Sequence, residues 1–232
     1  LKKYIKGQLD GVRGVNLEIK DGEFVSFLGP SGCGKSSTLR MIAGLEDVTE
    51  GEIWIGDRLV NDVVPQDRNV AMVFENYALY NYMTVYQNIA FPLQLRKVPE
   101  DEIKKTVYNV AEMLQITNIL YEKPTQLSGG QKQRISIARA LVKDPQVVIF
   151  DDCLSAVDAR TEKEIIENLY QYLDNKTAII ITHRIFSLFQ FDKIIVMSDG
   201  AIAEQGTHLE LMQKQGIYAE MYARQQEKEQ NL

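Results

Sequence analysis

The sequence is poor in the residues that mark several classes of protein. It has 2 cysteines in 232 residues, too few for a secreted scaffold built on disulfides. Its longest apolar runs are short, as in Val147–Phe150, whereas a helix that crosses a bilayer needs about 18 such residues. It lacks an excess of positive charge, because 26 Lys and Arg stand against 32 Asp and Glu. We therefore expect no membrane span and no nucleic-acid partner.

The remaining composition is ordinary for a globular protein. The chain is 45% hydrophobic and 25% charged, which excludes disorder and low-complexity classes. Its length fits one generous domain or two small lobes with a shared core. The first residues, Leu1–Tyr4, do not form a signal peptide, and the missing initiator methionine suggests a trimmed chain. These features predict a soluble domain that faces the cytosol.

Short apolar runs rich in β-branched residues predict buried strands, and helical patterns lie between them. The predicted strands are Phe24–Leu28, Val147–Phe150, Thr177–Thr182 and Ile194–Met197. Apolar residues at spacings of three and four predict a helix over Glu100–Leu114, and the tail from Gly216 is also helical. Strands that alternate with helices favour an α/β fold with a mostly parallel sheet.

Two further features of this fold are predicted from local patterns. An antiparallel β patch is expected from about Val15 to Val60, with turns at Lys20–Gly22 and Ile55–Asp57. A helical lobe, covering about residues 76–145, is inserted in the core.

The segment Gly29–Ser36 fits the phosphate-loop pattern G-x-x-x-x-G-K-[ST] in the context that the pattern requires. A predicted strand ends at Leu28, and a predicted helix covers Ser37–Ala43. In such a loop the backbone N–H groups and the helix N-terminus surround a phosphate. Lys35 is expected to reach the β- and γ-phosphates, and the Ser36 hydroxyl is expected to bind Mg²⁺. The alternative is a glycine-rich turn with an incidental lysine.

Two other motifs point to the same chemistry. Asp151 follows a buried strand, where a carboxylate that holds Mg²⁺ belongs, although a strand that ends in a turn gives the same pattern. Leu127–Gln131 reads LSGGQ, in which Ser128 and Gln131 can form a capping box for a helix over Lys132–Leu141. Two glycines in a first helical turn are costly, so this helix end is a second candidate phosphate site. The pair of sites implies either two ligands or one ligand held between two copies.

With these motifs in order along nearly the whole chain, the sequence resembles the nucleotide-binding domain of ABC transporters. The resemblance implies a P-loop NTPase (RecA-like) core and ATP with Mg²⁺ as ligands. It also implies a head-to-tail dimer, in which each ATP lies between one phosphate loop and the signature of the other subunit. The D-loop then corresponds to Ser155–Asp158, and His183 contacts the γ-phosphate and the attacking water. His208 has no such role and is interpreted as a surface residue.

The resemblance assigns a full set of site residues. Those implied to bind the nucleotide are Tyr4, Gly29, Pro30, Ser31, Gly32, Cys33, Gly34, Lys35, Ser36, Ser37, Ser128, Gly129, Gly130, Gln131 and Asp158. The implied metal ligands are Ser36, Asp151 and Glu75, and the implied catalytic residues are Asp152, His183 and Glu75. Tyr4 is placed like the aromatic residue that stacks on adenine.

Two of these positions depart from the family pattern. Asp152 stands where the family has a glutamate as general base, and Asp is one methylene shorter. Glu75 stands where the family has a neutral glutamine that binds the metal, so its charge faces an anionic phosphate. We expect near-normal binding of Mg·ATP with slow hydrolysis.

The two parts of the chain resemble different branches of the family. Up to about Pro145 the motifs resemble importer ATPases of the multiple-sugar type. From about Val147 they resemble exporter domains with a degenerate site, which predicts a mosaic and allows an engineered chimera. The aromatic-rich segment Phe74–Phe91 is expected to form the groove that receives a helix of a transmembrane subunit, so the chain would lie at the inner face of the membrane.

Three functions therefore compete. The first is an ATPase that drives transport by nucleotide-dependent dimerisation, and the second is an ATP-binding module with vestigial hydrolysis. The third is a DNA-repair or chromosome-type ATPase. It is disfavoured because only 93 residues separate Lys35 from Ser128, too few for a long coiled coil, and because basic charge is lacking. Cys33 lies within the phosphate loop, and we expect ATP to protect it from thiol reagents.

Overall fold

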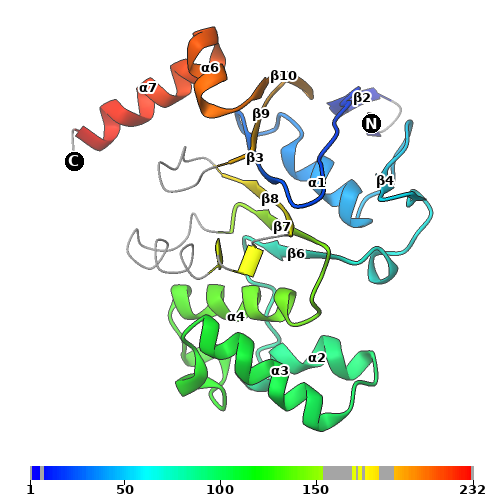
Figure 1. The fold of residues 1–232 in the computed structure, drawn as a ribbon, viewed down its shortest axis with the longest axis vertical. Helices are drawn as coiled ribbons and strands as arrows, with labels where there is room; N and C mark the ends of the chain where they lie inside the picture. Colours follow the sequence, from blue (N-terminus) through cyan, green and yellow to red (C-terminus); the bar gives the residue numbers. More distant parts are fainter. Residues whose placement is uncertain are drawn as a thin grey trace. The chain divides into compact units, whose positions relative to one another are not determined.

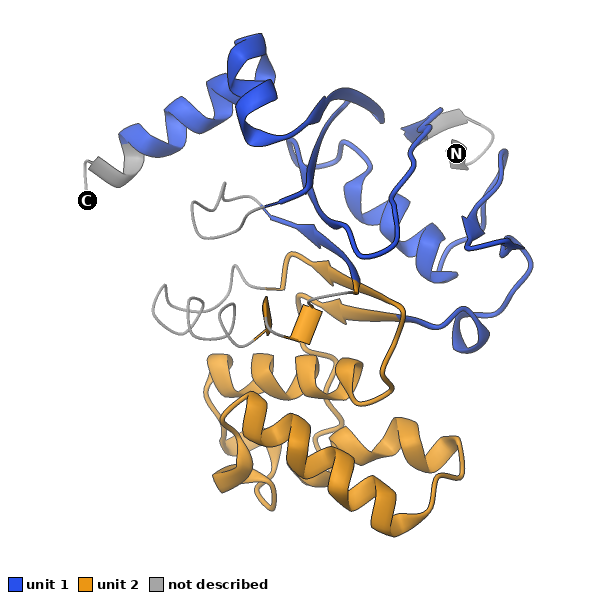
Figure 2. Cartoon of the chain, viewed as in Figure 1, with its two compact units in different colours: residues 1–70, 177–232 blue, residues 71–176 orange. Residues whose placement is uncertain are grey.

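The structure is a computed structural model, and it describes residues 2–5, 8–153, 169–170, 172–173, 176–182 and 191–230. The chain divides into two compact units, which are coloured separately in Figure 2. Unit 1 comprises residues 1–70 and 177–232, and unit 2 comprises residues 71–176. The helical lobe expected over about residues 76–145 falls within the sequence of unit 2.

Four strands of unit 1 are neighbours in the order β10, β9, β3, β8 (Figure 1). The strand β3 (Phe24–Leu28) is parallel to both β8 (Thr177–Ile181) and β9 (Lys193–Ser198), and β10 (Ala201–Gly206) is antiparallel to β9. Every residue of β3 and β8 is buried, which explains their continuous apolar sequences. The predicted strands are confirmed to within one residue at each end, and the fold is α/β with mainly parallel strands.

Besides β9 and β10, the described part of unit 1 has two separate antiparallel strand pairs. One pair is β1 (Lys2–Ile5) with β2 (Gln8–Arg13), and the other is β4 (Trp54–Ile55) with β5 (Arg58–Leu59). The predicted turn at Ile55–Asp57 joins β4 to β5, and Gly56 has a φ of 58° there. The predicted turn at Lys20–Gly22 is closed by a hydrogen bond from Glu23 N to Lys20 O, but residues 14–20 before it are irregular rather than a strand.

The described residues of unit 1 also form three α-helices and one short 3-10 helix. They are α1 (Lys35–Ala43), α6 (His208–Lys214), α7 (Ile217–Gln230) and η1 (Pro65–Asp67). Leu211 of α6 and Tyr218 of α7 are fully buried in a cluster with Leu28, Ile194 and Val196. The helical tail predicted from Gly216 is confirmed as α7.

His208 is exposed, as the sequence predicted, but it has a defined partner. Its Nδ1 atom lies 2.7 Å from the hydroxyl oxygen of Tyr218. Burial raises the pKa of Tyr218 to about 12, so this hydroxyl stays protonated at neutral pH. The contact ties the first residue of α6 to α7.

Unit 2 combines two neighbouring strands with helices. The strands are β6 (Val70–Phe74), which leads into the unit, and β7 (Val147–Asp151). The helices whose bounds the structure describes are α2 (Val85–Leu95), α3 (Glu100–Met113) and α4 (Gly129–Leu141), and two 3-10 helices, η2 (Thr117–Ile119) and η3 (Pro124–Gln126), lie between α3 and α4. The buried residues of α3 are Ile103, Val107, Val110 and Ala111, the apolar face that the sequence predicted. Within the described ranges, no helix is both long enough and apolar enough to cross a membrane.

Candidate phosphate-binding site

The phosphate loop connects β3 to α1 in unit 1, and three of its glycines have positive φ angles. The angles are 141° at Gly29, 81° at Gly32 and 96° at Gly34, where L-residues with a side chain are strained. Two of these glycines are also close to other backbone: a Cβ on Gly29 would collide with the carbonyl oxygen of Met197, and one on Gly34 would collide with that of Gly11. The loop conformation therefore requires glycine at these positions, both for the positive φ angles and for the close approach of other backbone atoms.

The side chain of Lys35 folds back into this loop. Its ammonium nitrogen donates to the carbonyl oxygens of Gly29 at 2.7 Å and Pro30 at 2.9 Å, and lies 3.7 Å from the sulfur of Cys33. The residue is only 5% exposed. A buried ammonium needs such acceptors, because an unpaired buried charge is costly. The loop thus fixes a positive charge among its own backbone carbonyls.

The N-terminus of α1 lies at the same loop. Gly34 occupies the N-cap position without a side-chain hydrogen bond to the helix, and Thr38 Oγ1 donates to Gly34 O at 2.8 Å. First-turn N–H groups without a side-chain cap are the donors that bind phosphate at helix ends. Ser31 and Gly32 are exposed, whereas Ser36 and Ser37 are half-buried in the first turn. The predicted phosphate-binding residues Gly29–Ser37 therefore form the loop after β3 and the first turn of α1.

Arg68 holds the other end of α1, and the sequence analysis did not identify this residue. Its guanidinium donates to Met41 O at 2.8 Å and Ile42 O at 3.0 Å, in the last turn of the helix. It also donates to the carbonyls of Val63 and Asn61, so it ties α1 to the segment before η1. Burial lowers the pKa of Arg68.

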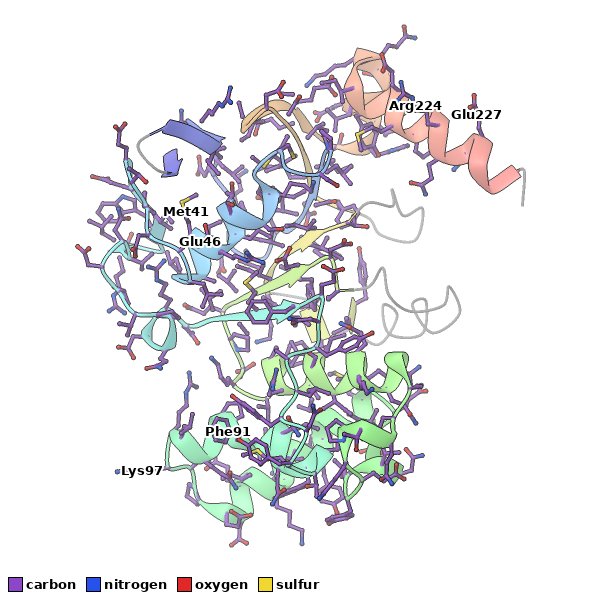
Figure 3. The ribbon with its side chains drawn as sticks, turned by 180° about the vertical axis from the view of Figure 1, so that it is seen from behind. Met41, Glu46, Phe91, Lys97, Arg224 and Glu227 are labelled. Carbon is purple, nitrogen blue, oxygen red and sulfur yellow. The ribbon has the colours of Figure 1, made fainter. Side chains whose placement is uncertain are left out.

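Gly44 is the C-cap residue of α1 and packs closely against Arg68. Its φ of 80° is left-handed, and a Cβ there would approach the guanidinium of Arg68 to 2.5 Å. Figure 3 labels Met41 and Glu46, which lie at this end of the helix. Arg68 and Gly44 thus fix the C-terminal end of α1, and the N-terminus of the helix continues directly from the loop.

Asp151 and Asp152 follow each other at the end of β7 in unit 2. Asp151 is the last strand residue and is 6% exposed, and Asp152 has a left-handed φ of 47°. Cys153 comes next and is buried, and desolvation raises the pKa of its thiol. Asp151 is thus a buried carboxylate at the strand end, and Asp152 is partly exposed in the bend that follows it.

The signature residues form the N-terminus of α4 in unit 2. Gln131 N donates to Ser128 Oγ at 3.3 Å, and Ser128 N donates to Gln131 Oε1 at 2.9 Å, which is a complete capping box. Gly129 and Gly130 are helical residues, so α4 begins three residues before the predicted start at Lys132. Ser128 and Gly129 are exposed, so this helix end is open to a ligand.

Glu75 is exposed directly after β6 in unit 2. It lies in a turn that Tyr77 N closes by donating to Phe74 O at 3.2 Å. The segment Phe74–Phe91 was expected to form a groove. Within it, the rings of Tyr80 and Phe91 pack edge to face, with their centroids 5.2 Å apart. Tyr82 is exposed.

Three of the predicted site residues have no described side chain. Tyr4 lies in β1, of which the structure describes the backbone. Asp158 and His183 lie outside the described residues. The remaining residues fall into two groups, with the phosphate loop in unit 1 and with Glu75, the signature and the two aspartates in unit 2.

Comparisons with known proteins identify related sequences along most of the chain. Residues 12–155 match the family model described as ABC transporter. The chain is 48% identical over 218 residues to the trehalose/maltose import ATP-binding protein MalK of Thermococcus litoralis, and covers 58% of that protein with 90% of its own length. It is 45% identical to the sn-glycerol-3-phosphate import ATP-binding protein UgpC of Brucella abortus, with coverage of 92% of this chain and 62% of the relative. The chain thus spans less than two thirds of these relatives.

Solved structures match the fold. The dimeric ATP-binding cassette MJ0796 in a post-hydrolysis state with ADP and Pi has a TM-score of 0.80 and 32% identity, covering 89% of this chain and 94% of that chain. A bacterial Atm1-family ABC exporter with ATP bound has a TM-score of 0.84 and 33% identity, covering 97% of this chain and 40% of that chain. The matches to the importer relative and to the exporter structure both extend past Pro145 of this chain. They therefore give no support to the predicted mosaic or to a chimera.

Proposed function

The chain belongs to the ABC transporter family, and we propose that it binds ATP and hydrolyses it to drive transport through a membrane partner. The observation that carries this proposal is the loop in which Lys35 is held 2.7 Å from Gly29 O at the N-terminus of α1. A fixed ammonium beside first-turn N–H groups is suited to the charge of a triphosphate. The relatives named above are ATP-binding import proteins, which agrees with this ligand.

The proposed nucleotide contacts follow from the chemistry of the two helix ends. In unit 1 the loop residues Gly29–Ser37 surround the phosphates with backbone N–H groups, and Lys35 binds the β- and γ-phosphates. The adenine is assigned to Tyr4, which the resemblance places as a stacking residue. In a head-to-tail dimer the signature residues Ser128–Gln131 of a second copy bind the γ-phosphate, and Asp158 contributes from the D-loop. The dimeric state of the cassette MJ0796 supports this assembly.

Magnesium fits the proposed donors, which are the Ser36 hydroxyl and the carboxylates of Asp151 and Glu75. These are hard oxygen ligands, and Mg²⁺ is usually held by one or two carboxylates together with phosphate oxygens and waters. When bound, Mg²⁺ neutralises charge on the β- and γ-phosphates.

Hydrolysis is proposed to proceed by attack of water on the γ-phosphorus. Asp152 accepts the proton of the water, the bond from the γ-phosphorus to the bridging oxygen breaks, and ADP leaves with phosphate as the second product. His183 orients the water and contacts the γ-phosphate. We expect the rate to be reduced because Asp152 is shorter than glutamate and because Glu75 adds negative charge near the phosphates.

The proposed physiological role is import of a small solute. The named relatives import trehalose and maltose or sn-glycerol-3-phosphate, so a sugar or a polyol phosphate is the proposed class of cargo. The proposed docking segment for the transmembrane subunit is Phe74–Phe91, which puts the chain at the inner face of the membrane.

Equilibrium binding of ATP tests the core of this proposal. We expect the unmodified chain to bind Mg·ATP, and the substitution Lys35→Met to weaken binding by roughly tenfold or more, since it removes a charged donor. The matched control is Lys104→Met, because Lys104 is an exposed lysine of α3. Equal affinities of the unmodified chain and Lys35→Met would refute the assignment of the phosphate loop.

A further inference from the structure

The turn that contains Glu75 has an unusual backbone. Tyr77 N donates to Phe74 O at 3.2 Å and so closes a four-residue turn around Glu75. Tyr77 and Ala78 then have φ angles of 59° and 47°, two successive left-handed residues without glycine. This conformation is disfavoured for residues with a Cβ, so contacts from elsewhere must stabilise it.

Arg139 of α4 supplies such contacts. Its Nη1 atom donates to Ala78 O at 2.7 Å, and its Nη2 atom donates to Tyr77 O at 3.1 Å. The planar guanidinium therefore binds two successive carbonyls at once, which a lysine could not do. The same group lies over the ring of Tyr80, 5.4 Å from the ring centroid.

The surroundings of Arg139 indicate a role in holding the backbone rather than in pairing charge. The side chain is half-buried, and burial lowers its pKa. Among the described residues no carboxylate forms an ion pair with Arg139, and its recorded hydrogen bonds go to the two carbonyls of the turn. Both hydrogen bonds have a charged donor, so they are stronger than bonds between neutral groups and hold the two carbonyls in place.

The far side of the loop is fixed separately from α2. Asn88 is fully buried, and its side chain accepts from Tyr80 N at 2.8 Å and donates to Tyr80 O at 3.1 Å. The ring of Tyr80 packs on Phe91, which Figure 3 labels in α2. Because Asn88 anchors the loop at Tyr80, Arg139 has to fix only the short stretch between Glu75 and that anchor.

The helix that carries Arg139 also carries the signature. α4 begins at Gly129, directly after the Ser128 cap, and Arg139 follows ten residues later on the same helix. At 1.5 Å per residue the two ends are about 15 Å apart along one rigid element. Figure 2 shows α4 and the turn after β6 within unit 2, so this connection lies inside a single compact unit.

We propose that Arg139 is a positioning residue that holds the backbone of the turn containing Glu75 and connects this turn to the signature helix α4. The hydrogen bond to Tyr77 O holds the residue that closes the turn, and the bond to Ala78 O holds the strained residue after it. A displacement of α4 at its signature end is passed by Arg139 to the backbone next to Glu75. This inference deepens the proposed function and rests on it for the role of Glu75.

Native-state cleavage by chymotrypsin tests the positioning itself, without reference to ATP. Arg139→Met is expected to speed cleavage after Tyr77 by about tenfold, because two charge-assisted hydrogen bonds to the turn are lost. Cleavage after Tyr121, which is 72% exposed, serves as the internal reference. The cleavage rate of Arg139→Lys should fall between those of the unmodified chain and Arg139→Met, since lysine keeps the positive charge but cannot donate to both carbonyls as the planar guanidinium does.

Two further variants separate this role from general stability. Arg134→Met is the matched control, because Arg134 also lies on α4 and donates to Leu114 O at 3.3 Å, away from the turn. It should leave cleavage after Tyr77 unchanged. Ala78→Gly combined with Arg139→Met should restore protection, because glycine adopts the left-handed conformation without strain. Equal cleavage in the Arg139→Met and Arg134→Met variants, or no rescue by glycine, would overturn the proposal.

Kinetics then tests the consequence for Glu75. Arg139→Met should lower kcat for ATP roughly 10- to 100-fold, as expected for a misplaced site group, while KM changes by less than about twofold because the phosphate loop is untouched. A rise in KM with unchanged kcat would contradict the inference. If the unmodified chain does not hydrolyse ATP at all, the proposed function fails, and the proteolysis still decides whether Arg139 holds the turn.

Discussion

Lys35 donates a hydrogen bond of 2.7 Å to the carbonyl oxygen of Gly29, the residue with which its own loop begins. The bond closes the loop on itself and keeps the ammonium in one place. It also links the lysine of the motif to its first glycine, whose φ of 141° a residue with a side chain rarely adopts. The geometry of the phosphate loop thus depends on several of its residues together.

The two central glycines of the loop should differ in their tolerance of a side chain. Gly32→Ala introduces only the strain of a left-handed alanine, about 1–2 kcal/mol, because no atom lies within 4 Å of the new Cβ. Gly34→Ala adds a collision with the Gly11 carbonyl, and overpacking costs roughly another 1–3 kcal/mol. Urea unfolding of the two variants measures the difference. Equal losses of stability would contradict the close approach of Gly34 to Gly11.

Asp152→Glu should increase ATP turnover. The longer side chain restores the reach of a general base, which contributes about 10²–10⁴-fold in rate when well placed. Steady-state kinetics with the two proteins side by side measures the gain, and nucleotide affinity should stay the same. A turnover of the unmodified chain on the order of 1 s⁻¹ or more, with no gain from Asp152→Glu, would show that the shorter base suffices.

Ser128→Ala separates the two functions of the signature serine. Loss of the capping box should lower the free energy of unfolding by about 1 kcal/mol. Thr207→Ala removes the equivalent capping box of α6 and should cost a similar amount. Only Ser128→Ala should also reduce ATP turnover. If both variants reduce turnover equally, Ser128 acts through helix stability alone.

Cys33 should react with a maleimide more slowly when ATP is bound. Its sulfur lies 3.7 Å from Lys35 Nζ, so a nucleotide in the loop blocks the approach of the reagent. Cys153 is the internal control, because it is buried as Cys33 is but lies outside the phosphate loop, and burial raises the pKa of its thiol. Peptide mapping by mass spectrometry gives the rate at each cysteine. A Cys33 rate that does not respond to ATP would place the nucleotide elsewhere.

The sequence predicts those parts of the fold in which local pattern and burial agree. The apolar run of β3 ends at the first glycine of the phosphate loop, and its bounds are correct. The start of α4 was predicted too late, because glycines at positions 129 and 130 argue against helix by propensity. The capping box of Ser128 and Gln131 outweighs that cost.

The strands that the sequence analysis missed are those with weak local signals. β10 has the sequence Ala-Ile-Ala-Glu-Gln-Gly at residues 201–206 and is half-exposed, so it lacks the apolar run of a buried strand. β6 is the exception, because its run Val-Ala-Met-Val-Phe is apolar and is typical of a buried strand. Arg68 and Arg139 could not be found from sequence, because the helix carbonyl that Arg68 binds lies 27 residues away, the turn carbonyl that Arg139 binds lies 61 residues away, and backbone carbonyls carry no sequence signal.

Steady-state turnover of Mg·ATP by the unmodified chain and by Asp151→Asn tests the central claim most directly. The account predicts measurable release of phosphate by the unmodified chain, enhanced by Asp152→Glu. It also predicts loss of turnover in Asp151→Asn, because the neutral amide removes a carboxylate proposed to hold Mg²⁺. Turnover by Asp151→Asn at the rate of the unmodified chain, or no turnover in the unmodified chain and in Asp152→Glu alike, would contradict it.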